Sequence, residues 1–182
     1  MNDGHEHEAI ADTRRWLERA VIGLNLCPFA KAVHVKQQVR FVLSDAELPD
    51  DLLEELAEEL LRLRDTPADD IDTTLLIHPR TLSDFLDYND FLDRVDALIE
   101  ALELDGILQV ASFHPDYRFA DSEADDPGNC TNRAPYPTLH LLREASLDKA
   151  VAAYPDADFI VERNLDTMAK LGLGGFRKLL VE

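Results

Sequence analysis

The feature that most constrains the fold of this chain is the alternation of short strand-like runs with longer helical segments. Four runs bounded by turn residues are typical of strands: Val39–Leu43, Thr73–Ile77, 106–113 and 138–142. Helical periodicity fills the connections between the first three runs. Parallel strands need a crossover of about a dozen residues or more, usually a right-handed helix. The alternation therefore predicts that the first three strands are parallel.

Five segments have the apolar spacing of amphipathic helices: 9–24, 50–64, 81–102, 146–154 and 157–171. The second is the clearest, because leucines recur on one stripe from Leu53 to Leu63 with glutamates between them. Thr81 is the expected N-cap of the third helix, with Asp84 three residues later as in a capping box. Gly172 is placed to end the fifth helix in a left-handed conformation.

These segments predict an α/β fold, in which a small four-stranded sheet, mainly parallel or mixed, has about five helices packed on it. The direction of the fourth strand stays open, because a connection without periodicity, 115–138, precedes it. A chain of 182 residues suits one domain. We expect a single domain over 1–182, with 1–8 as a disordered tail and 172–182 as a C-terminal extension.

Net charge excludes one class of partner. The chain has 37 acidic and 18 basic side chains, and a formal charge of −19 argues against a protein that binds nucleic-acid phosphates. Residues 45–105 contain 20 of the acidic side chains and only 4 of the basic ones. This acidic block is typical of the solvated faces of helices. A partner-binding surface and a salt adaptation are the alternatives.

Other features indicate where the protein works. No apolar run approaches the roughly 20 residues that cross a bilayer, so no membrane partner is expected. The N-terminal residues lack the basic-then-apolar layout of a secretion signal. Cys27 and Cys130 are too few for a disulfide framework. We therefore expect a cytoplasmic protein.

Two of the predicted strands end in the same dipeptide. His78-Pro79 follows the strand Thr73–Ile77, and His114-Pro115 follows the strand at 106–113. If these strands are parallel, both imidazoles emerge at the carboxyl edge of the sheet, where open α/β sheets bind ligands. A structural role for each histidine is the alternative. The repetition favours a site that includes both rings.

The connection 115–138 concentrates polar and aromatic side chains, and loops of this length in compact domains tend to be functional or disordered. Its aromatic residues argue against disorder. Arginine, amide and phenol donors suit the binding of a carboxylate or phosphate, and the candidates are Arg118, Asn132, Arg133 and Tyr136. Arg133 is the strongest candidate for a ligand contact. Alternatively, the two arginines order the loop by pairing with Asp121, Asp125 and Asp126.

Cys27 is the candidate nucleophile. It lies just beyond the first predicted helix, and Pro28 restricts the backbone there. A nucleophilic thiol needs a base or a positive neighbour to lower its pKa from about 8.5. The candidates for that base are His34, His114 and His140. The predicted catalytic set is Cys27, His114 and His140, and the alternative for Cys27 is a buried small hydrophobic residue.

A metal site is a further hypothesis. Five residues would supply enough ligands for zinc, although their spacing matches no compact zinc signature: Cys27, His34, His114, Cys130 and His140. No residue is therefore assigned to a metal. His5 and His7 form a close pair but belong to the predicted tail. The chain has no glycine fingerprint for a dinucleotide, so the cofactor stays unknown.

Several long strings resemble those of a bacterial family of proteins of unknown function. They are RWLE at 15–18, GLNLCPFA at 23–30, ASFHPDYRFA at 111–120, TNRAPYPTLHLLRE at 131–144 and ERN at 162–164. The resemblance covers about residues 9–171. It implies one domain and no particular activity. Cys130 stands where the resemblance points to an aromatic residue, which argues against a catalytic or metal role for this thiol.

Together these observations predict a cytoplasmic small-molecule enzyme, a hydrolase or transferase that acts on an anionic substrate at the carboxyl edge of the sheet. A non-catalytic protein that binds a partner through the acidic block is the alternative, and a metal-binding protein is the third hypothesis. The sequence does not set the oligomeric state.

Overall fold

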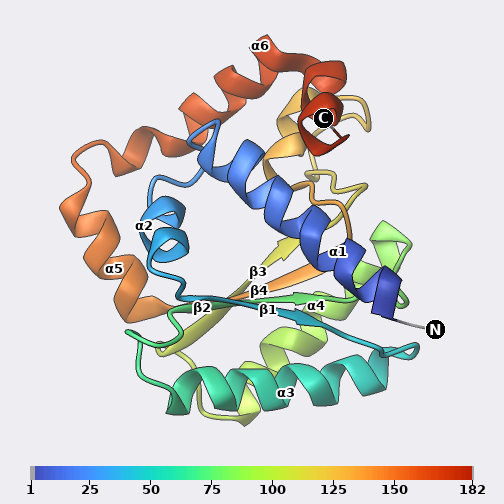
Figure 1. Ribbon diagram of the computed structural model, residues 1–182, viewed down its shortest axis with the longest axis vertical. Coiled ribbons are helices and arrows are strands. Elements are labelled where there is room, and N and C mark those ends of the chain that lie inside the picture. The colour runs from blue at the N-terminus through green and yellow to red at the C-terminus, as the bar shows by residue number, and fades with distance from the viewer. Residues whose placement is uncertain (1–2, 182) are drawn as a thin grey trace.

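The computed structural model of the protein describes residues 3–181, with the backbone alone for residues 3–7. Figure 1 shows one sheet in the middle of the molecule, with helices on both of its faces. The elements in chain order are α1 (Asp3–Trp16), η1 (Leu17–Ile22), α2 (Ala30–Val35), β1 (Val39–Leu43), α3 (Pro49–Asp65), β2 (Thr73–Ile77), α4 (Phe85–Ala101), β3 (Leu108–Phe113), η2 (Pro127–Asn132), β4 (Thr138–Arg143), α5 (Glu144–Ala153), η3 (Ala157–Phe159) and α6 (Ile160–Val181). The predicted α/β class is confirmed.

The four strands form a mixed sheet in the order β1-β2-β4-β3. Strands β1 and β2 are parallel, and β4 is antiparallel to both β2 and β3. The first three strands therefore run in one direction, and β4 enters between β2 and β3 in the opposite direction. Its direction, which the sequence left open, is thus antiparallel. In the register, His140 on β4 lies between Leu75 of β2 and Ala111 of β3.

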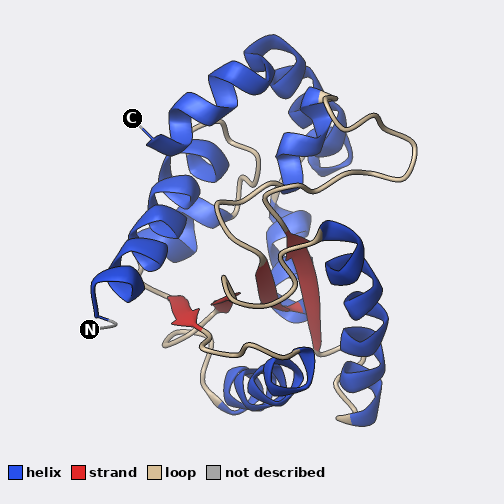
Figure 2. Ribbon diagram, turned by 90° about the vertical axis from the view of Figure 1, so that its right-hand side faces the viewer, coloured by secondary structure: helices blue, strands red, loops and turns tan. Residues whose placement is uncertain are grey.

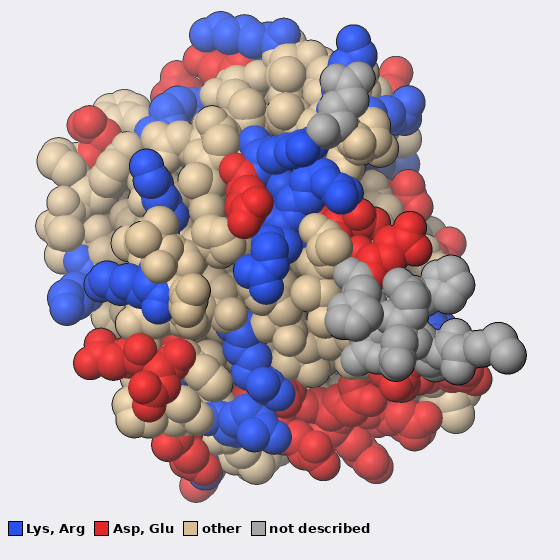
Figure 3. Space-filling view, viewed as in Figure 1, with Lys and Arg blue, Asp and Glu red and all other residues tan. Residues whose placement is uncertain are grey.

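Helices α3 and α4 cover one face of the sheet. The stripe of α3 that is fully buried begins at Leu52 rather than at the expected Leu53, which is only partly buried, and continues to Leu63. Each fully buried leucine stabilises the fold by roughly 1.5–3 kcal/mol. Glu54 and Glu58 lie on the outer side of α3 and are exposed. Figure 3 shows acidic side chains gathered over this helix, as expected of solvated helical faces.

The other face of the sheet is covered in two parts. Helices α1 and α6, together with η1, pack on the sheet through a second apolar cluster that includes Trp16, Ala20, Met168 and Phe176. Helices α2 and α5 lie beside them on the same face (Figure 1). Figure 2 shows the long connection between β3 and β4 looping out on that side. A cavity remains between these helices and the sheet.

Two helix ends differ from the expectations, and one helix was not expected. Asp84, and not Thr81, caps α4, because the Asp84 carboxylate accepts hydrogen bonds from the backbone N–H groups of Leu86 and Asp87. Gly172 has the positive φ expected of it (69°) but an extended ψ (169°), and the helix resumes beyond it, where Phe176 is buried in the second cluster. The short helix α2 was not predicted.

No helix in the described part of the chain is long and apolar enough to cross a membrane.

Residues 1–2 lie outside the described part, as do the side chains of His5 and His7, so the predicted tail is described only from the start of α1.

Candidate ligand-binding site

The two histidines that follow β2 and β3 come together around Tyr88 of α4. The His78 ring stacks on the Tyr88 ring with centroids 5.7 Å apart. The centroid of the His114 ring lies 5.0 Å from the centroid of the Tyr88 ring. All three residues are fully buried. The Tyr88 hydroxyl donates to the Thr138 carbonyl and accepts from the Phe113 N–H. The carboxyl edge of the sheet is thus filled with packed aromatic rings.

Hydrogen bonds to backbone carbonyls hold both histidine rings in place. His78 Nδ1 donates to the Thr81 carbonyl and His114 Nε2 donates to the Leu82 carbonyl, each over 3.1 Å. His114 Nδ1 accepts from the backbone N–H of Asp116, so this ring is neutral. Burial lowers the pKa of His78 to about 4 and also lowers the pKa of His114. These rings brace the ends of two strands.

Three of the four candidate anion ligands of the loop form hydrogen bonds to the protein itself. Arg133 donates to the carbonyls of Tyr117 and Ala124, and Asn132 donates to the carbonyl of Ser112.

Tyr136 donates to the Asp12 carboxylate, while Arg118 is exposed. Arg133 therefore orders the loop, though through backbone carbonyls and not through the aspartates considered above. Sequence reasoning missed Asn129, a fully buried residue whose amide accepts from the Phe119 N–H and the Ser122 hydroxyl and donates to the Glu123 carbonyl.

A large cavity lies on the face of the sheet opposite α3 and α4. Its volume is about 680 Å³, which is within the range of roughly 300–1,000 Å³ typical of small-molecule sites. Leu75, Ala111 and His140 form its floor on three adjacent strands, and α2, α5 and η1 form its walls. We call it the sheet cavity. It lies on a face of the sheet and not at the carboxyl edge.

His140 is the only predicted catalytic histidine that lines the sheet cavity among the described residues. Its Nε2 lies 2.7 Å from the hydroxyl oxygen of Thr73, on the neighbouring strand. Burial lowers the pKa of His140 to about 4, so the ring is neutral at neutral pH. Thr73 was missed, because in the sequence it reads as an ordinary strand residue.

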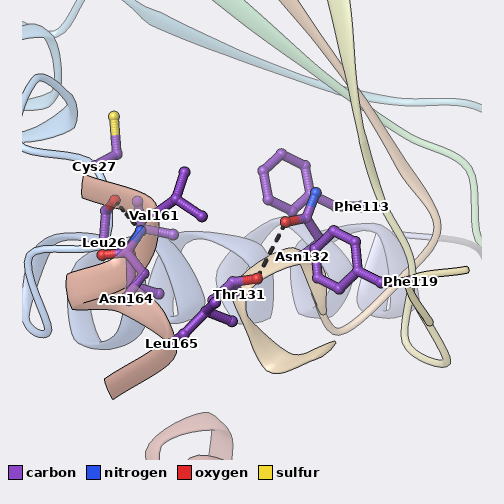
Figure 4. Close-up of a pocket in the computed structure, with 10 residues that line it drawn as sticks. Leu26, Cys27, Phe113, Phe119, Thr131, Asn132, Val161, Asn164 and Leu165 are labelled. Atoms are coloured by element: carbon purple, nitrogen blue, oxygen red, sulfur yellow. Dashed lines mark hydrogen bonds between the residues drawn. The ribbon is translucent and has the colours of Figure 1, made fainter. Parts of the chain in front are cut away.

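Cys27 also lines the sheet cavity, and hydrogen bonds from α6 hold the backbone just before it. Asn164 of α6 donates to the Leu26 carbonyl over 2.8 Å, and Arg163 donates to the Asn25 carbonyl over 2.9 Å. Figure 4 shows Asn164 beside Leu26, and Cys27 at the edge of a second, smaller cavity of about 320 Å³. Burial raises the pKa of the Cys27 thiol. The thiol is therefore protonated at neutral pH.

Both signs of charge are present around the sheet cavity. Lys36 and Lys149 are exposed, and neither forms an ion pair with another described residue. Arg143 donates to backbone carbonyls and so keeps its charge unpaired. Asp69 and Asp72 also line the cavity, and Asp72 accepts a 2.6 Å hydrogen bond from Ser146. The cations outnumber the carboxylates.

The five residues considered as metal ligands do not come together at one place, and only Cys27 and His140 line the same cavity. His34 pairs with Glu18, Cys130 is buried in the second cluster, and His114 lies against Tyr88. No group of three or more histidine, cysteine or acidic side chains meets among the residues that the structure describes.

A family model described as "Protein of unknown function (DUF1415)" matches residues 8–178. The chain belongs to this family. The expected membership of a family of unknown function is thus confirmed, and the DUF1415 match includes all the residues that line the sheet cavity. No curated protein and no solved structure matches the chain.

Proposed function

We propose that this protein binds a small amphipathic molecule with an anionic group in the sheet cavity. The observation that carries the proposal is the cavity itself, an apolar space of ligand size with a few polar groups at defined positions. We also propose that it works in the cytoplasm, where its two cysteines, both free thiols, would stay reduced.

The walls of the cavity suit the apolar part of such a ligand. The side chains of Trp16, Phe29, Phe113, Leu147 and Tyr154 surround a floor of Leu75 and Ala111. Each methylene group that leaves water for such a surface contributes about 0.8 kcal/mol. An aliphatic or aromatic body therefore provides most of the affinity.

The charges around the cavity suit an anionic head group. The ammonium groups of Lys36 and Lys149 are exposed and unpaired among the described residues, and the Arg143 guanidinium adds a third positive charge. The negative charges of Asp69 and Asp72 oppose these three positive charges, but Asp72 already accepts a hydrogen bond from the Ser146 hydroxyl. A carboxylate at the surface thus finds more cations than anions.

An enzymatic role, as a hydrolase or transferase, is the second candidate function. The observation that favours it is that Cys27 and His140 line the same cavity. A neutral imidazole accepts a proton, and a thiol that loses one becomes a nucleophile. His114, the third member of the predicted catalytic set, lies in the cluster around Tyr88 and takes no part in this pair.

Calorimetric titration with decanoate tests the binding proposal. Ala111→Phe fills the cavity from its floor and Ala150→Phe from the α5 wall, whereas Ala97→Phe places the same ring on the exposed side of α4 as a control. We expect decanoate to bind the wild type and the control alike, and to bind both filled variants at least about tenfold more weakly.

Circular dichroism and urea unfolding establish which variants are folded. Because the two filled positions lie on different elements, one variant still tests the proposal if the other does not fold. If a folded variant with a filled cavity binds decanoate as tightly as the control does, decanoate binds outside the sheet cavity. No heat of binding with the wild type would contradict the proposal.

A further inference from the structure

The hydroxyl of Thr73 lies between two neighbours and bonds to both. Its Oγ1 is 2.6 Å from the carbonyl oxygen of Leu141 and 2.7 Å from Nε2 of His140. A hydroxyl has one hydrogen to donate, and a carbonyl oxygen can only accept. The hydrogen of Thr73 is therefore directed to Leu141. It follows that His140 Nε2 carries a hydrogen and donates it to Thr73.

This arrangement determines the state of the other ring nitrogen of His140. A neutral imidazole carries one N–H, and here it is on Nε2, so Nδ1 has a free lone pair. No hydrogen bond to Nδ1 occurs among the described residues, and Nδ1 is not among the buried polar atoms that lack a partner. Nδ1 is thus open, and His140 lines the sheet cavity.

The surroundings of this nitrogen are apolar. His140 lies between Leu75 and Ala111 in the sheet, and the ring of Phe113 is 6.0 Å away between centroids. A single acceptor in an apolar floor favours a ligand that brings one donor to it. A hydroxyl is such a donor. An ammonium group would have to lose its hydration in an apolar site, which costs far more.

We propose that the ligand of the sheet cavity is a hydroxylated amphipathic acid whose hydroxyl donates to His140 Nδ1, with Thr73 as the positioning residue that holds the ring in the accepting tautomer. The inference rests on the function proposed above and narrows it to one class of ligand. The carboxylate of this ligand lies toward Lys36 and Lys149, and its hydroxyl lies at the floor.

Nitrogen-15 NMR of the histidine side chains tests the tautomer without any ligand. In the wild type we expect a pyrrole-type Nε2 and a pyridine-type Nδ1 for His140. Thr73→Ser keeps the hydroxyl and this pattern, whereas Thr73→Val keeps the shape but removes the acceptor and raises the population of the Nδ1–H form. A pyrrole-type Nδ1 in the wild type would overturn the inference.

Calorimetry with matched decanoates tests the ligand class. The probes carry a hydroxyl or a methoxy group at carbon 3, 6 or 10, with decanoate as the reference. In the wild type and in Thr73→Ser, we expect at least one hydroxydecanoate to bind about fivefold more tightly than its methoxy partner, the effect of one hydrogen bond. In Thr73→Val we expect this ratio to fall to about one.

The outcomes separate the two proposals. If decanoate and all its derivatives fail to bind, the proposed function is wrong. If they bind and no hydroxyl is preferred over its methoxy partner in the wild type, the proposed function stands and the hydroxylated ligand is wrong. If Thr73→Val does not fold, the wild-type tautomer and the wild-type preference still decide the inference.

Discussion

The three internal histidines illustrate how position within a strand sets the environment of a residue. His140 lies inside β4, where alternate side chains point to opposite faces, so it faces away from Leu139 and Leu141 and toward the sheet cavity. His78 and His114 follow the ends of their strands and turn toward Tyr88. The same residue type therefore lines a cavity at one position and packs against an aromatic ring at the other two.

At the same scale, the enzymatic hypothesis predicts a difference between the two cysteines. Cys27 lines the cavity, whereas Cys130 is buried in the second apolar cluster. We expect the wild type to release p-nitrophenol from p-nitrophenyl decanoate, and the rate to rise above neutral pH because burial raises the pKa of the Cys27 thiol. Cys27→Ala loses at least about 100-fold of this rate.

Cys130→Ala is the matched control and keeps the wild-type rate. If Cys27→Ala, folded by circular dichroism, hydrolyses the ester as fast as the control, Cys27 is not the nucleophile and the binding function stands alone.

Among the elements, α6 illustrates how distant segments fix the cavity. Arg163 and Asn164 hold the carbonyls of Asn25 and Leu26, and Arg163 also donates to the Tyr154 hydroxyl beyond α5. One helix therefore joins the segment that carries Cys27 to the wall formed by α5. This gives the strings GLNLCPFA and ERN a shared structural role, which neither string indicates by itself.

The break in α6 gives a prediction for this element. Gly172 has φ 69° and ψ 169°, a region that side chains strongly disfavour, although a Cβ there would meet no neighbour within 4 Å. Gly172→Ala should therefore reduce the free energy of unfolding by about 1–3 kcal/mol. Gly174→Ala is the control, because it adds a methyl group in open space to a helical residue and is expected to be neutral or stabilising.

Urea unfolding of both variants measures the effect. Equal stability of the two variants would mean that the chain at Gly172 adopts an ordinary helical conformation in solution.

On the scale of the whole molecule, the buried neutral histidines make the stability of the fold depend on pH. Burial lowers the pKa values of His78 and His140 to about 4, against an ordinary value near 6.5. Between these two pKa values, the histidines bind protons in the unfolded chain but not in the folded chain. The stability contributed by each neutral ring is complete above about pH 6.5 and is lost as the pH falls toward 4.

We therefore expect the free energy of unfolding to decrease between pH 6.5 and pH 4.5. Each buried histidine contributes a slope of about 1.4 kcal/mol per pH unit. His78→Phe keeps a ring beside Tyr88 and removes one titrating group, so its slope should be smaller by about that amount.

Urea unfolding at steps of half a pH unit gives both slopes, and the carboxylates common to the two proteins cancel in the difference. Parallel curves would show that His78 titrates alike in the folded and unfolded chains.

Local pattern determined much of the fold. The bounds predicted for β1 and β2 agree with the structure, and the stripe of α3 and the parallel direction of the first three strands follow from residues close in sequence. Side-chain alternation and helical spacing depend on neighbours along the chain, so the sequence alone suffices for them. The cap of α4 was misplaced by three residues, because Thr81 and Asp84 both suit that position.

Only the tertiary structure decided the site. The hydrogen bond between Thr73 and His140 joins residues 67 positions apart, and it exists because β4 enters the sheet between β2 and β3. The place of β4 in the sheet depends on the path of the loop 115–138, which has no periodicity. Many paths of a loop of this length cost a similar conformational entropy, so the sequence of the loop does not select one of them. The sequence determined which side chains were available and which face of each strand they occupy. The packing of α2 and α5 decided that Cys27 and His140 share a cavity while His114 does not.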